Sequence, residues 1–111
     1  GPFVIEPAVS RKIGKTAMTE MTLAAQDWKS ADWAFQKGLF SAIYSKENLD
    51  AEVLNFAKKL SSYNPEALSE MKKIIWEGTE KWDSLLLERA KITGKLVLSD
   101  FTKTALLQFK N

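Results

Sequence analysis

The chain has 111 residues, of which 45% are hydrophobic and 27% are charged, and its formal net charge is +2. This length suits one domain and is short for two, and the composition is that of a folded globular protein rather than a disordered one. Basic residues adjoin only in pairs, so there is no basic stripe and we expect no nucleic-acid partner. The chain contains neither Cys nor His, which excludes disulfides, thiol and imidazole catalysis, and nearly all zinc chemistry.

The sequence also contains no apolar run near the roughly 20 residues that a membrane-spanning helix needs. Its first residues show no basic segment followed by an apolar one, as a signal sequence would. From these two observations we expect no membrane partner and a cytoplasmic location. From the absence of Cys and His we expect no metal site.

The first part of the chain predicts three helices. Pro7 suits the first position of a short helix that Gly14 ends, and the apolar residues after Lys15 recur at spacings of three and four, which predicts a second helix. Ser30 is placed to cap a third helix, barely two turns long, that Gly38 ends in the left-handed conformation.

The apolar run at residues 39–44 follows directly, and it predicts a short extended segment packed under neighbouring helices. Asn48 is then expected to cap a helix with an apolar stripe that faces a core. The stripe consists of Leu49, Val53, Phe56, Ala57 and Leu60.

Three more helices are predicted in the remainder. Asn64 and Pro65 begin the first of them, and Thr79 and Ser99 are expected to cap the other two. Gly94 costs about 1 kcal/mol inside a helix, so we expect either a kink or a close helix contact there. No segment alternates long enough to form a sheet, and the pattern predicts an all-α chain of six or seven helices.

The aromatic residues include four tryptophans, which allow two interpretations. A ligand cage is one, and packing in a core or a subunit interface is the other. Packing is favoured, because each ring buries a large apolar area. The four are Trp28, Trp33, Trp76 and Trp82.

Several motifs in register resemble one family. The segment Ser30-Ala31-x-x-Ala34-x-x-x-Gly38-Leu39 is similar to the segment that closes the core of the crotonase superfamily, the enoyl-CoA hydratases and isomerases. Two further matches lie at the expected places: Ile13-Gly14-Lys15, and Asn64-Pro65-Glu66-Ala67-Leu68 followed by Lys72 or Lys73.

This resemblance implies that residues 1–111 form a single helical C-terminal region that follows a spiral core. Residues 1–44 would be the end of the core-proximal segment, and residues 45–111 the helical assembly region. Family subunits associate as trimers, often paired into hexamers. The resemblance therefore implies a homo-oligomer, and we expect the fragment to pair its apolar faces as a dimer or a swapped assembly.

The resemblance also has consequences for the catalytic activity expected of this chain. The family's oxyanion-hole amides and catalytic glutamates lie in stretches upstream of Gly1, so we predict no catalytic residue and no activity for this chain alone. The parent's substrate would be a coenzyme A thioester, with no tightly bound cofactor. Gly1-Pro2-Phe3-Val4-Ile5 replaces the Pro-Gly-Ala-Gly-Gly loop of hydratases, which leaves hydratase, isomerase or other crotonase chemistry open.

Residues 105–110 resemble the family's terminal Gly-x-x-Ala-Phe-x segment, with one residue inserted. That helix lies near the CoA nucleotide in the family, so the resemblance implies that Lys103, Phe109 and Lys110 contact CoA. For the two lysines, the alternative is a solvated basic helix end that complements the helix dipole.

For the whole chain, the alternative is an independent helical interaction module. A small four-helix acyl-CoA carrier is disfavoured, because its expected motif is not found.

Overall fold

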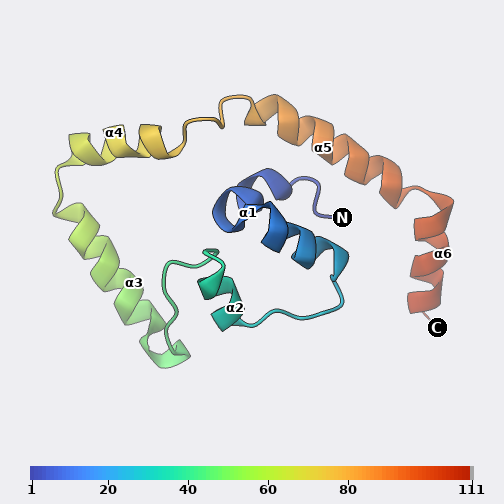
Figure 1. Cartoon of the computed structure of the whole chain (residues 1–111), viewed down its shortest axis with the longest axis horizontal. Coiled ribbons are helices and arrows are strands. Elements are labelled where there is room, and N and C mark those ends of the chain that lie inside the picture. The colour runs from blue at the N-terminus through green and yellow to red at the C-terminus, as the bar shows by residue number, and fades with distance from the viewer. Residues whose placement is uncertain (111) are drawn as a thin grey trace. The chain divides into compact units, whose positions relative to one another are not determined.

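The computed structural model describes residues 1–110, and within them the chain forms six α-helices and no β-strand (Figure 1). The predicted all-α class and the number of helices are confirmed. In chain order the helices are α1 (Glu6–Leu23), α2 (Ala31–Gln36), α3 (Lys46–Ser61), α4 (Pro65–Ile75), α5 (Trp82–Val97) and α6 (Asp100–Phe109). None of them is both long and apolar enough to cross a membrane.

The helices belong to two compact units. The split unit consists of residues 1–28 together with the chain after residue 80, and the middle unit consists of residues 29–80. The split unit thus contains α1, α5 and α6, and the middle unit contains α2, α3 and α4. The functional division predicted at residue 44 is a different partition and stays a prediction.

Helix α1 is bent at Gly14. Two helices that meet at Gly14 were expected here, and the structure has them as the two arms of α1 on either side of a kink at Gly14, the one residue of the element with a non-helical backbone, at φ 79° and ψ 165°. Glycine reaches this region of backbone space because it has no Cβ. Ile13 lies just before the bend and Ala17 and Met18 just after it, and all three side chains are buried.

Three helices begin with the side-chain caps that the sequence predicts. Each capping residue is in the extended region and accepts a hydrogen bond from a backbone N–H of the first turn, which satisfies a donor that has no partner within the helix. The caps are Ser30 to the amide of Trp33 at 3.0 Å, Asn64 to that of Glu66 at 2.9 Å, and Ser99 to that of Thr102 at 3.3 Å.

Gly38 ends α2 as predicted, with φ 89°. The amide of Leu39 donates to the carbonyl of Ala34 at 2.9 Å, and the amide of Gly38 donates to that of Phe35 at 3.1 Å. This pair of bonds is the Schellman motif, in which a left-handed residue lets the chain satisfy the last carbonyls of a helix.

Two predicted caps are wrong. Helix α3 begins at Lys46 after an extended Ser45, so Asn48 lies inside its first turn. The hydroxyl of Thr79 donates to the carbonyl of Trp76 at 2.7 Å and therefore closes the end of α4 instead of opening α5. Both errors have the same cause, since several polar residues at each boundary are competent to cap or to turn.

The expectations for Gly94 are also wrong. Helix α5 continues through this residue to Val97, and a Cβ added at Gly94 would meet nothing within 4 Å. The glycine therefore marks neither a kink nor a close helix contact.

The predicted apolar stripes are formed, but the described residues of their own units do not bury them. Helices α3, α4, α5 and α6 contain no buried residue, and the ring of Phe56 in the α3 stripe is 61% exposed. The segment at residues 39–44 is non-helical as expected, yet Phe40 and Tyr44 within it are exposed, so its predicted packing is wrong. Trp28 is 99% exposed, so it lies outside the buried residues of the split unit. A subunit interface at these surfaces stays a prediction.

Candidate functional site

The end of α5 and the start of α6 meet at a corner held by hydroxyl groups (Figure 1). The hydroxyl of Thr102 donates to the carbonyl of Leu96 at 2.7 Å, and the hydroxyl of Ser99 accepts from the amide of Thr102. These bonds fix the direction in which α6 leaves α5, because they tie its first turn to the last turn of the preceding helix.

The three residues predicted to contact CoA lie on or just after α6. Lys103 and Lys110 are seven positions apart, which places them about 10 Å apart along one side of the helix. Phe109 is 93% exposed and lies around the helix from them. None of the three hollows described below is lined by any of these residues, and their contact with CoA stays a prediction.

A different side of α6 borders a hollow of about 420 Å³. Its lining is one longitudinal stripe of the helix, and it includes none of the three predicted residues. The lining residues are Asp100, Phe101, Thr104, Ala105 and Gln108.

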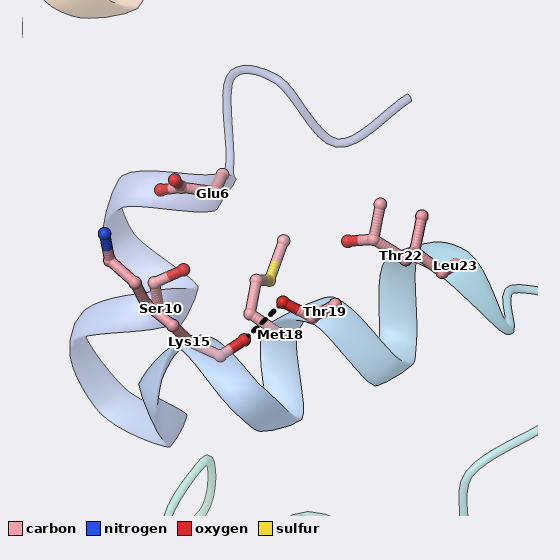
Figure 2. A pocket seen from close by; sticks show the side chains of 7 residues that line it. All are labelled: Glu6, Ser10, Lys15, Met18, Thr19, Thr22 and Leu23. Atoms are coloured by element: carbon pink, nitrogen blue, oxygen red, sulfur yellow. Dashed lines mark hydrogen bonds between the residues drawn. The ribbon is translucent and has the colours of Figure 1, made fainter.

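The bend in α1 creates a second hollow, of about 260 Å³, on the inner side of the helix (Figure 2). Residues from both arms line it, and Met18 rises between the arms from the buried floor. The lining residues are Glu6, Ser10, Lys15, Met18, Thr19, Thr22 and Leu23. The hollow thus combines a carboxylate, an ammonium group and three hydroxyls with two apolar side chains.

Arg89 of α5 joins the two parts of the split unit close to this hollow. Its Nη1 donates to the carbonyl of Phe3 at 3.3 Å and lies 4.0 Å from Oε1 of Glu6. Both charged side chains are about one third exposed, so the ion pair contributes about 1 kcal/mol or less.

Arg89 and Phe3 also line a further hollow of about 320 Å³. This hollow shares Glu6 and Thr22 with the hollow of α1. The two hollows are therefore adjacent.

The sequence interpretation missed this arrangement, although part of it was readable. Lys15, Thr19 and Thr22 recur at the spacing of one helix face, and so do Glu6 and Ser10 before the glycine. An acid near a helix N-terminus, such as Glu6, is ordinarily interpreted as a solvated residue that complements the helix dipole. Glu6 does lie there, but it also faces Arg89, which comes from 83 positions further along the chain. A contact between residues so far apart in the chain cannot be predicted from a local sequence pattern.

Among residues 1–110, no group of three or more acidic side chains is placed to hold a metal ion. Neither the family models, nor the curated proteins, nor the solved structures compared with this chain gave a match.

Proposed function

We propose that this chain is the helical C-terminal region of a crotonase-family protein, an enoyl-CoA hydratase or isomerase of acyl-CoA metabolism in the cytoplasm. Its role in that protein is subunit assembly and closure of the CoA site. The observation that carries the proposal is the apolar surface of the middle unit, which no part of that unit buries.

Three residues of the resemblance support the proposal, because each has a definite structural role in the middle unit. Ser30 caps α2, Ala34 is buried within it and Gly38 reverses the chain after it. The resemblance therefore involves residues that shape the beginning and the end of α2.

The burial pattern supports an assembly role. Ala34 is the one buried side chain among residues 29–80, whereas folded units of this size bury about 60% of the surface that the unfolded chain exposes. Large apolar side chains on α3 and α4 are instead exposed: Val53, Leu54, Phe56, Met71, Ile74 and Ile75. Exposed apolar surface in excess of what a monomer usually shows marks a site of protein contact.

The substrate of the parent enzyme would be a coenzyme A thioester, and the chemistry would reside in segments other than this one. Lys103, Phe109 and Lys110 would lie beside the CoA nucleotide in the assembled protein. This chain alone is proposed to be inactive, since it supplies neither the oxyanion-hole amides nor the paired glutamates of the family.

Light scattering on the purified chain tests the assembly role. We expect dimers or larger homo-oligomers over a range from about 1 to 200 µM, by pairing or by exchange of helices. A clean monomer at the highest concentration would contradict self-assembly and would favour the alternative, an independent helical module that docks on a different protein.

Two further observations test the link to CoA chemistry. The coding sequence upstream of Gly1 should encode a glycine-rich oxyanion segment, and a start codon or an unrelated domain there would contradict the proposal. The chain alone should also leave crotonyl-CoA unchanged. Hydration of this thioester by the isolated chain would show that the reactive groups are in residues 1–111.

A further inference from the structure

Two of the three hydroxyls in the hollow of α1 have no hydrogen-bond partner among the described residues. Helical Ser and Thr residues commonly bond to a carbonyl of the preceding turn, and Thr19 does so here, with its hydroxyl 2.7 Å from the carbonyl of Lys15. Ser10 and Thr22 make no side-chain hydrogen bond to any described residue. Figure 2 shows both hydroxyls directed toward the space above Met18. Two donors are thus left for a ligand or for water.

The charges around the hollow favour an anion. Lys15 forms no ion pair with a described residue, and its ammonium group stands on the same side of the hollow as Ser10 (Figure 2). Glu6 is the one carboxylate in the lining, and Arg89 lies 4.0 Å from it. Among the side chains that line the two adjacent hollows, Lys15 and Arg89 are the cations and Glu6 is the one carboxylate, so these side chains carry one net positive charge for a ligand to balance.

The rest of the lining is apolar. Met18 is 5% exposed at the floor, and Leu23 lies at the opposite end from Lys15. A volume of about 260 Å³ far exceeds the roughly 10–15 Å³ that one water needs on the same measure. The hollow therefore suits a small organic molecule better than a single ion.

We propose that the hollow of α1 binds a short-chain monocarboxylate. The carboxylate accepts hydrogen bonds from the ammonium of Lys15 and the hydroxyl of Ser10, and its apolar chain lies over Met18 toward Leu23. A monoanion matches the single unbalanced positive charge, whereas a phosphate monoester carries about −1.5 to −2 at pH 7 and would be repelled by Glu6. This site does not depend on the proposed CoA function.

Titration of the full chain with sodium hexanoate, followed by amide chemical shifts at constant ionic strength, tests the site. We expect saturable shifts in the millimolar range for amides of both arms of α1. Hexan-1-ol has the same chain without the charge, and it should produce no saturable shift in that range. Absence of hexanoate shifts on α1, or equal binding of the alcohol, would overturn the proposal.

Two variants locate the charge contact. Lys15→Gln should raise the Kd for hexanoate at least fivefold, because it removes the ammonium from the lining. Lys12→Gln is the matched control, since Lys12 is an exposed lysine of the same helix outside the lining, and it should leave the Kd within twofold. Equal loss in both variants would show diffuse charge attraction instead of a site. Unchanged amide shifts elsewhere establish that each variant is folded.

Discussion

The two units of the molecule place their apolar residues differently. The split unit buries Ile13, Ala17 and Met18 around the bend of α1, and Arg89 links its two parts across more than 80 positions of sequence. The middle unit has hydrogen-bonded helix caps and many large apolar residues. Ala34 is nevertheless the one residue that it buries.

This difference separates two requirements that are often discussed together. Caps and turns make a helix begin and end at the right residue, and each contributes about 1 kcal/mol through neighbours in sequence. Burial requires a second surface, and it supplies about 25 cal/mol per Å² of apolar area. The middle unit meets the first requirement, and it needs another surface to meet the second.

The largest expected effect is the loss of a buried side chain in the split unit. Met18→Ala should destabilise α1 by about 2–5 kcal/mol, because a buried methionine leaves a cavity. Met71→Ala on the exposed face of α4 should cost about 0.5 kcal/mol or less in the monomer. Native-state hydrogen exchange, read on the amides of α1 and of α4 in dilute protein, compares the two directly. Equal costs would mean that the middle unit has a core of its own.

The second effect concerns the surface that the middle unit leaves exposed. Phe56→Asp should weaken self-association at least about tenfold, since burial of a phenylalanine stabilises by about 1.5–3 kcal/mol and 1.4 kcal/mol corresponds to a tenfold change. Asn55→Asp adds the same charge on the same helix and serves as the control. Sedimentation equilibrium measures both, and loss of association in the control alone, or in neither variant, would place the interface elsewhere.

The third effect contrasts two glycines of the split unit. Gly14→Ala should destabilise α1 by about 1–3 kcal/mol, because its φ of 79° and ψ of 165° lie in a region that is nearly restricted to glycine. Gly94→Ala should stabilise α5 by about 0.5–1 kcal/mol, since the added methyl meets open space in a helix interior. Thermal unfolding monitored by circular dichroism shows whether each substitution raises or lowers the stability of the protein. A stabilising Gly14→Ala would mean that the bend is not required.

Most of the local structure was predictable from the sequence, and the reason is physical. Ser30, Gly38, Asn64 and Ser99 act on bonds within a few residues of themselves, so their roles follow from residue type and position alone. Where several polar residues compete, as around Asn48, the boundary was missed by two to three residues.

The tertiary level was less predictable. A stripe such as that of α3 shows that an apolar face exists, but it does not show which surface covers it. The hollow of α1 required the bend at Gly14 to bring two helix faces together, and the approach of Arg89 to Glu6 required the folded chain. Periodicity alone does not supply either one.

The smallest effect tests whether the middle unit depends on its local bonds. Ser30 and Ser45 both precede a helix in the extended conformation, but only the hydroxyl of Ser30 accepts a hydrogen bond from its helix. Ser30→Ala should therefore lower the protection of α2 amides against hydrogen exchange by about 1 kcal/mol, the usual cost of losing a cap. Ser45→Ala should change the protection of α3 by a few tenths of a kcal/mol, because no cap bond is lost. If the two substitutions cost the same, the hydrogen bond to the amide of Trp33 does not stabilise α2, and this unit relies on other contacts.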